Sequence, residues 1–243
     1  MSLYSALKKW IPRSLQMRWE PQLRWISYQL GYKGNQFSCP VCQAKLRTFI
    51  QLESGDLLCP SCGSLPRNRR LWILLQDYIL PGMNMLHFSP SRPLRRRLEK
   101  WQGIQYTSTD YASEFPADKQ LDITQIDEPG NKYDLIICFH VLEHIPDDRK
   151  ALSELFRILK PGGKCLIQTP FKIGAIYEDD SITAPSERLR HFDQEDHVRI
   201  YSAEGLAQRA RDVGFQVEIL RFSDTPENEL GLKEREEVLV LEK

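Results

Sequence analysis

The sequence has no long run of apolar residues. Its longest apolar stretches, LWILL from Leu71 and LIICF from Leu135, are far shorter than the roughly 20 residues that a helix needs to cross a bilayer. The first ten residues are polar, basic and aromatic, without the apolar central block of a secretory signal. These absences predict a soluble, cytoplasmic protein, and 243 residues suffice for one large domain or a medium domain with a small attachment.

The sequence also lacks a net charge, because 33 Lys and Arg residues balance 33 Asp and Glu residues. The charges are nevertheless divided: residues 1–100 contain 16 basic and 5 acidic residues, whereas residues 101–243 contain 17 and 28. Such asymmetry favours an anionic partner for the basic half, whether nucleic acid, a phosphate-bearing substrate or a membrane surface. A basic face that simply docks on an acidic one is the alternative.

Residues 1–36 combine tryptophan with basic residues and predict short helices. Trp10, Trp19 and Trp25 stand among Lys and Arg residues, while Pro12 and Pro21 interrupt any continuous helix. Peripheral contact with the inner face of a membrane is one interpretation, because Trp and basic side chains suit a membrane interface. The simpler interpretation is that these helices pack their Trp side chains on the main domain.

Four of the six cysteines form two Cys-x-x-Cys pairs in CPVCQAKLRTFIQLESGDLLCPSCGS, with 16 residues between the pairs. Each pair can point two sulfur atoms at one ion, and the intervening residues predict a hairpin, so residues 37–66 are interpreted as a zinc ribbon. A structural Zn²⁺ is favoured over catalysis or redox chemistry, because a redox motif needs only one pair. The predicted ligands are Cys39, Cys42, Cys59 and Cys62.

After the ribbon, strand and helix patterns alternate, which predicts an α/β fold with a mainly parallel sheet. We expect strands at 83–88, 104–110, 133–139, 164–171, 215–222 and 236–243, and helices at 67–80, 93–101, 148–159 and 203–213. Cys138 and Cys165 lie in apolar strand patterns and are predicted to be core residues. The expected organisation is a basic helical segment (1–36), the ribbon (37–66) and a larger domain (67–243, core 83–243), whose ligand should lie at the carboxyl ends of the strands.

The order of motifs over roughly residues 80–243 resembles that of one protein family. The segment KYDLIICFHVLEHIPDDRKALSELFRILKPGGKCLIQTPF (132–171) resembles the fourth strand, following helix and fifth strand of class I S-adenosylmethionine-dependent methyltransferases, in their small-molecule, type 11-like branch. LKPGG resembles the family's helix-ending turn, because Pro161 cannot continue a helix and glycines can take positive φ. The resemblance implies a Rossmann-like, mainly parallel seven-stranded sheet with helices on both faces, S-adenosylmethionine as cofactor, and methyl transfer.

The resemblance also assigns cofactor-binding residues. Asp110 matches the acidic residue that ends the second strand and binds the ribose hydroxyls, and Asp122 matches the carboxylate that accepts the adenine amino group. The first loop departs from the pattern, because His87 stands at the acidic position and Ser89 and Ser91 stand near the usual glycines. Backbone amides at a helix start can still meet a carboxylate there. The implied cofactor-binding residues are His87, Phe88, Ser89, Pro90, Asp110, Tyr111, Asp122, Ile123, Phe139, His140 and Val141.

HVLEH, residues 140–144, also satisfies the H-x-x-E-H spacing of a zinc protease family. That function requires both histidines on one face of an α-helix. Here a predicted strand runs straight into His140 and Pro146 follows soon after, so we expect a strand-to-loop exit without room for such a helix.

The loop RHFDQEDHVRIYSAEGL, residues 190–206, is the predicted acceptor side. Its His, Arg and acidic side chains suit proton transfer and the binding of an anionic group. A hydrogen-bond network that anchors the loop is the equally weighted alternative. Because an alcohol acceptor needs a base, His197 or His144 is predicted to be catalytic.

Three functions follow from these observations. The leading hypothesis is a methyltransferase that acts on a small-molecule or glycan-type acceptor. The second keeps the chemistry but makes RNA the substrate, bound by the basic ribbon half. The third is a non-enzymatic binding module whose methyltransferase-like domain has lost its cofactor.

Overall fold

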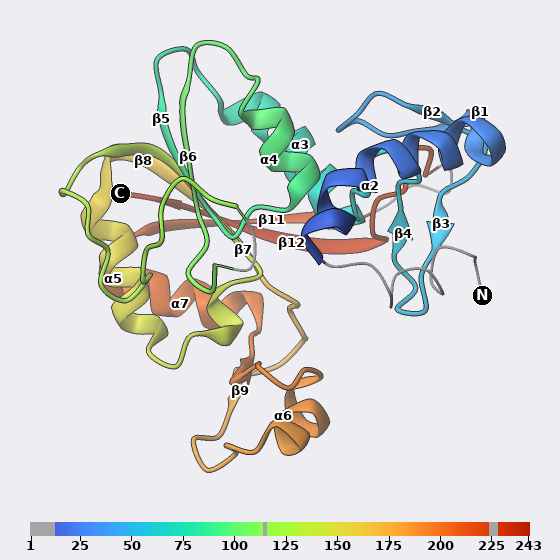
Figure 1. Cartoon of the computed structure of the whole chain (residues 1–243). Helices are drawn as coiled ribbons and strands as arrows, with labels where there is room; N and C mark the ends of the chain where they lie inside the picture. The colour runs from blue at the N-terminus through green and yellow to red at the C-terminus, as the bar shows by residue number, and fades with distance from the viewer. Residues whose placement is uncertain (1–12, 114–115, 224–227) are drawn as a thin grey trace. The chain divides into compact units, whose positions relative to one another are not determined.

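The structure is a computed structural model that describes residues 13–113, 116–223 and 228–243. The chain forms two compact units (Figure 1). One contains Met1–Asp77, Ser91–Arg97 and Asp224–Glu234, and the other contains Tyr78–Pro90, Leu98–Ser223 and Arg235–Lys243. We call them the ribbon unit and the sheet unit and describe each by itself.

The ribbon unit is built from short hairpins and helices. Its elements are α2 (Arg13–Ser27), the π-helix η1 (Tyr28–Tyr32), β1 (Lys33–Ser38), β2 (Lys45–Leu46), β3 (Ile50–Gln51), β4 (Leu57–Leu58), α3 (Pro66–Tyr78) and α4 (Arg92–Leu98). Strand β1 pairs with β2 and β3 pairs with β4, both antiparallel. The β3–β4 pair confirms the hairpin predicted between the two cysteine pairs, and its turn contains Gly55 at a φ of 85°.

A segment close to the C-terminus also belongs to the ribbon unit. Arg69 is fully buried and donates hydrogen bonds to the carbonyl oxygens of Ser64 (2.6 Å), Leu57 (2.8 Å) and Gly231. Its guanidinium group lies over the Phe49 ring, 4.4 Å from the ring centroid. Because a buried guanidinium must use its donors, Arg69 joins the hairpin, α3 and the segment around Gly231.

The sheet unit contains one six-stranded sheet with the order β11-β12-β8-β7-β5-β6. Its elements are β5 (Asn84–Phe88), β6 (Gln105–Thr109), β7 (Tyr133–Phe139), the 3₁₀ helix η2 (Leu142–His144), α5 (Asp148–Ile158), β8 (Leu159–Gln168), α7 (Ala203–Val213), β11 (Gln216–Ser223) and β12 (Arg235–Glu242). Strands β6, β5, β7 and β8 are parallel, and β12 is antiparallel to β8 and β11. The prediction of a mainly parallel sheet is therefore confirmed.

The predicted number of seven strands is wrong for the part of the chain that the structure describes. The segment after β6 reaches the sheet edge only at an isolated bridge between Thr109 and Lys119. Asp122 then accepts hydrogen bonds from the backbone N–H and hydroxyl of Thr124, at 2.8 and 2.7 Å, which turns the chain. This local side-chain turn competes with strand pairing and leaves no further strand at this edge.

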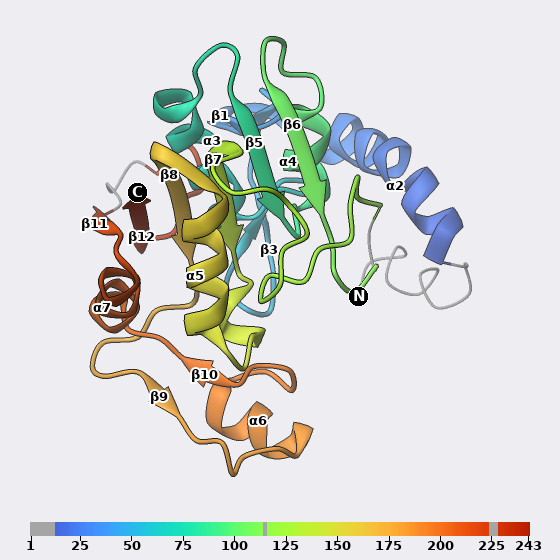
Figure 2. The same ribbon diagram turned by 90° about the vertical axis from the view of Figure 1, so that its left-hand side faces the viewer.

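The core of the sheet unit lies between the sheet and helices α5 and α7, which pack side by side on one face (Figures 1 and 2). Alternate strand residues enter this core, among them Leu86, Ile136 and Ile167. Cys138 and Cys165 are fully buried there, as predicted, and burial raises the pKa of both thiols. Both cysteines therefore act as apolar core residues.

The helix ends follow from local sequence. The Asp147 side chain accepts a hydrogen bond from the Lys150 amide at 3.0 Å and caps α5, and Ser202 caps α7 in the same way through the Gly205 amide. The predicted LKPGG turn appears as an interruption in pairing: Tyr133 pairs with Leu159, whereas Leu135 pairs with Lys164. Gly162 stands between them at a φ of 73°.

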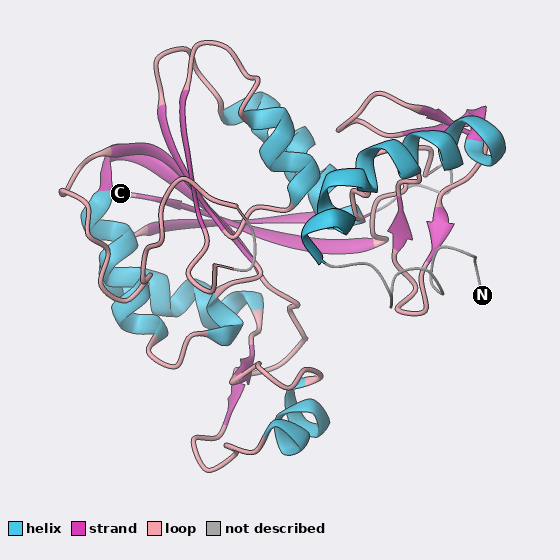
Figure 3. Ribbon diagram, in the orientation of Figure 1, coloured by secondary structure: helices cyan, strands magenta, loops and turns pink. Residues whose placement is uncertain are grey.

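An excursion between β8 and α7 was not predicted as regular structure. It contains β9 (Tyr177–Glu178), α6 (Pro185–Phe192) and β10 (Arg199–Ile200), of which β9 and β10 pair antiparallel (Figure 3). Its two strands have only two residues each, too few for a periodic sequence signal. This excursion carries the predicted acceptor loop. Among the described residues, none of the helices is long and apolar enough to cross a membrane.

Candidate active site

Three neighbouring parallel strands end together at one edge of the sheet. β5, β6 and β7 end at Phe88, Thr109 and Phe139, and Ser89, Asp110 and His140 follow them directly. The Ser89 amide donates to the Thr109 carbonyl at 2.7 Å. Ser89 and His140 both have positive φ, 43° and 55°, which non-glycine residues rarely adopt outside constrained turns and functional sites. The predicted position of the site at the strand carboxyl ends thus coincides with two unusual backbone turns.

The first loop and the predicted ribose-binding carboxylate lie together. The Ser89 hydroxyl donates to Asp110 Oδ1 at 3.5 Å, and Ser89 is exposed whereas Asp110 is 7% exposed. Pro90, the next residue of the loop, is buried. The loop that lacks glycines therefore presents a hydroxyl beside a carboxylate.

The strand residues before this loop point into the protein. His87 is 2% exposed, and burial lowers its pKa to about 3, so the ring is neutral at neutral pH. Its Nδ1 lies 3.2 Å from the Tyr106 hydroxyl. Phe88 lies in the core with Leu86. A cofactor-binding role is predicted for His87 and Phe88. Their side chains are nevertheless buried and turned away from the solvent-facing loop.

The residues predicted to bind the ribose and the adenine differ in how exposed they are. Tyr111 is 62% exposed, whereas Ile123 is 3% exposed and belongs to the core. Asp122 is half-buried, and the hydrogen bonds from the Thr124 side chain and backbone lower its pKa. Asp122 Oδ1 thus accepts hydrogen bonds from Thr124 within the local turn, which the sequence analysis did not predict.

HVLEH forms a strand exit followed by one short 3₁₀ turn. Phe139 ends β7 at 8% exposure, Val141 packs against the core, and η2 covers Leu142–His144. No α-helix presents His140 and His144 on one face in this described segment, which agrees with the rejection of the protease function.

Glu143, which sequence reasoning did not select, lies at the centre of a histidine cluster. Its residue is 1% exposed, and neither carboxylate oxygen has a hydrogen-bond partner. His140 Nδ1 lies 3.3 Å from Glu143 Oε1 without hydrogen-bond geometry. The rings of His144 and His197, the two predicted bases, lie 4.7 Å apart at 80°. The structure therefore brings both predicted bases together around a buried carboxylate.

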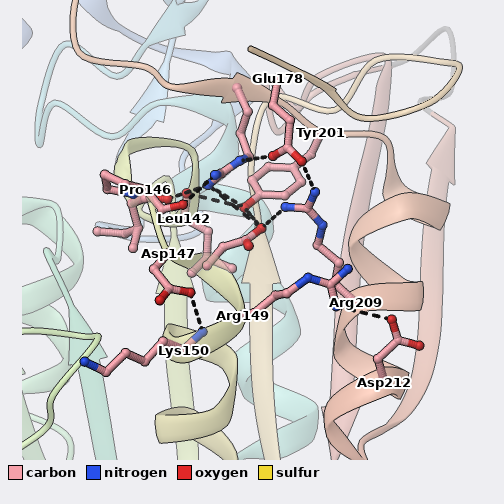
Figure 4. Close-up of polar contacts among 12 residues, drawn as sticks. Leu142, Pro146, Asp147, Arg149, Lys150, Glu178, Tyr201, Arg209 and Asp212 are labelled. Carbon is pink, nitrogen blue, oxygen red and sulfur yellow. Dashed lines mark hydrogen bonds and ion pairs between the residues drawn. The ribbon is translucent and has the colours of Figure 1, made fainter. Parts of the chain in front are cut away.

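Arg199 and Tyr201 of the acceptor loop belong to an ion-pair network, which we call the anchor network and which also contains Asp148 of α5, Glu178 of β9 and Arg209 of α7. Tyr201 donates to Asp148 at 2.5 Å, Arg199 donates to Glu178 at 2.8 Å, and Arg209 donates to both carboxylates. Figure 4 shows Glu178, Tyr201 and Arg209 converging. Arg199 also donates to the Pro146 carbonyl at 2.7 Å. Arg199 and Tyr201 thus match the anchoring alternative of the sequence analysis.

Sequence comparison identifies the domain. The sequence profile of the methyltransferase domain family matches residues 73–219, more than half of the chain. The chain belongs to the methyltransferase domain family. This assignment confirms the predicted methyltransferase domain, and the match runs from within α3 to β11, across the strand ends described above.

Individual relatives match shorter parts of this methyltransferase domain protein. A Mycolicibacterium smegmatis protein named "Probable S-adenosylmethionine-dependent methyltransferase" is 30% identical over 97 residues, which cover 40% of this chain and 34% of that protein. A ubiquinone biosynthesis O-methyltransferase of Coxiella burnetii is 33% identical over 48 residues, 20% of each chain. The chain thus spans about a third or less of the length of these curated relatives.

A solved structure supports the fold. The structure of an S-adenosylmethionine-dependent methyltransferase from Archaeoglobus fulgidus covers 73% of this chain and 93% of that chain, with a TM-score of 0.53 and 17% identity. At this identity the likeness concerns the methyltransferase fold alone.

The four cysteines of the ribbon unit lie outside the matched region and form one cluster. The Sγ atoms of Cys39 and Cys62, and those of Cys42 and Cys59, are 3.8 Å apart, and all four lie within 4.8 Å of one another. Gln43 and Gly63 take positive φ in two equivalent turns, in which the amides of Gln43 and Gly63 donate to the carbonyls of the first cysteine of each pair. Both predicted Cys-x-x-Cys turns therefore converge on one point.

The tryptophans of α2 are exposed. Trp19 and Trp25 are 55% and 59% exposed, and Ile26 and Leu30 of the same segment are also exposed. The simpler prediction, in which these Trp side chains are packed away, does not hold for Trp19 and Trp25. Trp10 lies outside the described residues.

Proposed function

We propose that this chain is an S-adenosylmethionine-dependent methyltransferase that methylates a small-molecule or glycan-type acceptor. The observation that carries the proposal is the shared edge of β5, β6 and β7, where Ser89 contacts Asp110 in a member of the methyltransferase domain family. The names of the relatives in M. smegmatis and C. burnetii support the same chemistry, and the second favours a hydroxyl acceptor.

The cofactor side of the proposal depends on Asp110. A carboxylate can accept two hydrogen bonds from the hydroxyls of a ribose, and Asp110 stands at the end of β6, beside the first loop. Ser89, which contacts Asp110, is assigned to the carboxylate of the methionine end. A glycine-poor loop is compatible with this function, because S-adenosylmethionine has no pyrophosphate that must be cradled by backbone.

The acceptor side depends on the loop that carries His197, which contacts the residues after β7 through the Val198 amide and the Glu143 carbonyl. An acceptor oxygen attacks the methyl carbon in line with the carbon–sulfur bond, whose electron pair leaves with sulfur, and the hydroxyl proton must pass to a base. His144 and His197 are the candidate bases, since their rings lie together after β7 and before β10. The anchor network fixes the loop that carries His197.

Calorimetric titration with S-adenosylmethionine and S-adenosylhomocysteine tests the proposal. We expect Asp110→Ala to weaken binding by about 1–3 kcal/mol, the usual loss of hydrogen bonds to a charged group. Asp127→Ala, which removes an exposed carboxylate of the same unit, is the matched control and should bind normally. Unchanged affinity of Asp110→Ala would remove Asp110 from the site. Absence of binding to the unmodified protein would favour the non-enzymatic module.

We also propose that Cys39, Cys42, Cys59 and Cys62 hold a structural Zn²⁺. A tetrahedral ion with zinc–sulfur bonds of about 2.3 Å separates its ligands by about 3.8 Å, the spacing of two of the sulfur pairs. Metal analysis of the purified chain should find zinc that Cys59→Ser loses and the core control Cys165→Ala keeps. Retention of all zinc by Cys59→Ser would exclude this site.

RNA is the second candidate acceptor, because the basic residues are concentrated in residues 1–100. Part of this charge is already used: Arg69 donates to backbone carbonyls, and Arg24 and Arg92 both pair with Glu20. Binding to RNA should weaken steeply with rising salt, by counterion release. Weak binding that does not respond to salt would exclude RNA.

A further inference from the structure

The side chains around Glu143 are hydrogen-bond acceptors at the atoms that remain without a proton. His197 Nδ1 lies 3.0 Å from the Phe192 carbonyl oxygen, which can only accept, so Nδ1 carries the proton and Nε2 the lone pair. His144 Nδ1 lies 3.1 Å from Asp196 Oδ2, an acceptor that favours a proton on this nitrogen as well. The remaining nitrogen of each ring is therefore an acceptor, like the carboxylate oxygens of Glu143.

The three side chains converge. One ligand atom each from Glu143, His144 and His197 lies within 4.8 Å of the other two. The Glu143 side chain is 2% exposed, and both its oxygens lack a hydrogen-bond partner. A buried carboxylate that accepts no hydrogen bond is costly, and neither the lone pairs of neutral imidazoles nor His140 Nδ1, 3.3 Å away without hydrogen-bond geometry, supplies one. A cation between the three groups satisfies all of them.

We propose that Glu143, His144 and His197 form a binding site for one divalent transition-metal ion. Two imidazoles and one carboxylate suit zinc, iron and their neighbours, whereas Mg²⁺ and Ca²⁺ prefer oxygen ligands. Ligand atoms around one such ion stand roughly 3.3 Å apart, so small side-chain rotations from the present spacing close the site.

The surroundings of the site have the features of a metal's outer shell. Each histidine is oriented by an acceptor on its other nitrogen, Asp196 for His144 and the Phe192 carbonyl for His197. The Val198 amide donates to the Glu143 carbonyl at 2.9 Å and holds the two chain segments together. A small cavity of about 70 Å³ adjoins the cluster, and Glu143, Thr169 and His197 help to line it.

The three protein ligands leave coordination positions for water or for an oxygen atom of a bound molecule. If the proposed methyl transfer takes place at this edge in the metal-loaded protein, His144 and His197 act as ligands instead of bases, and an acceptor hydroxyl bound to the metal would lose its proton more readily to solvent. This consequence rests on the proposed function, whereas the metal site itself does not.

Cobalt(II) chloride is the probe for this site, added to the full chain with zinc in the ribbon. We expect one additional Co²⁺ per chain, with weak d–d bands and without the thiolate-to-cobalt absorption that ribbon exchange would give. Glu143→Gln and His197→Asn should abolish this binding, and Asp196→Asn should weaken it by about 10- to 100-fold. Glu195→Gln, an exposed carboxylate of the same loop, is the matched control.

Melting of each variant in chelator verifies that it is folded. Absence of the additional Co²⁺ in the unmodified chain, or its retention by both Glu143→Gln and His197→Asn, would overturn the proposal. Because the titration measures metal alone, its outcome is separate from that of the cofactor titration with Asp110→Ala.

Discussion

The anchor network and the Glu143 cluster lie close together along the chain, since Asp148 follows Glu143 and His144 and Arg199 follows His197, but their buried carboxylates differ in hydrogen bonding. In the anchor network Asp148 accepts from Tyr201 and Arg209, and Arg199 pairs with Glu178. In the cluster both oxygens of Glu143 lack a hydrogen-bond partner, although the residue is equally buried. Satisfied buried charges anchor a fold, whereas a buried carboxylate that accepts no hydrogen bond costs stability, and the proposed metal site rests on this difference.

The largest expected effect comes from breaking the satisfied network. Asp148→Ala removes a carboxylate that is 3% exposed and leaves the charges of Arg209 and Arg199 partly unpaired. We expect a loss of about 3–5 kcal/mol in the free energy of unfolding, measured by denaturant titration. Tyr201→Phe, which removes one hydrogen bond, should lose about 1 kcal/mol. If Asp148→Ala loses less than about 1 kcal/mol, the network is not structural.

His87 is an intermediate case, a buried polar group with the Tyr106 hydroxyl beside it. Burial lowers its pKa to about 3, below the value of about 6.5 in the unfolded chain. The unfolded state therefore binds a proton first as the pH falls, so stability is complete above pH 6.5 and declines below it. Between pH 6.5 and 5 we expect a loss of about 2 kcal/mol that His87→Phe does not show. Parallel pH profiles of the two proteins would contradict this.

Substitution of Glu143 should have the opposite effect on stability from substitution of Asp148. Glu143→Gln replaces a buried carboxylate without hydrogen-bond partners by a neutral amide of the same shape. In chelator, we expect the variant to equal or exceed the unmodified protein in stability by about 1 kcal/mol, because an unsatisfied charge is removed. With Co²⁺ added, the unmodified protein alone should gain stability, since a ligand that binds only the folded state stabilises it. A strong loss in chelator would mean that Glu143 is satisfied by the fold.

The comparison also shows which features could be predicted from the sequence. The Cys-x-x-Cys pairs and the strand–helix alternation are local patterns, so the cysteine cluster, the parallel strands and helices α5 and α7 were predicted at nearly the right positions. Glu143 was passed over because its meaning depends on His197, which the fold brings back beside it. Burial of Ile123 and the turn at Asp122 depend on tertiary packing and on one side-chain hydrogen bond, which periodicity does not report.

The smallest effect is expected at the exposed border of the anchor network. Arg149 lies 3.5 Å from Asp212 (Figure 4), but their side chains are 60% and 43% exposed. Water and salt screen such a pair, and holding two long side chains in one geometry costs entropy. Arg149→Ala should therefore change the free energy of unfolding by only about 0–0.5 kcal/mol. A loss comparable to that of Asp148→Ala would show that burial does not separate structural from incidental ion pairs in this loop, and the contrast with Glu143 would lose its basis.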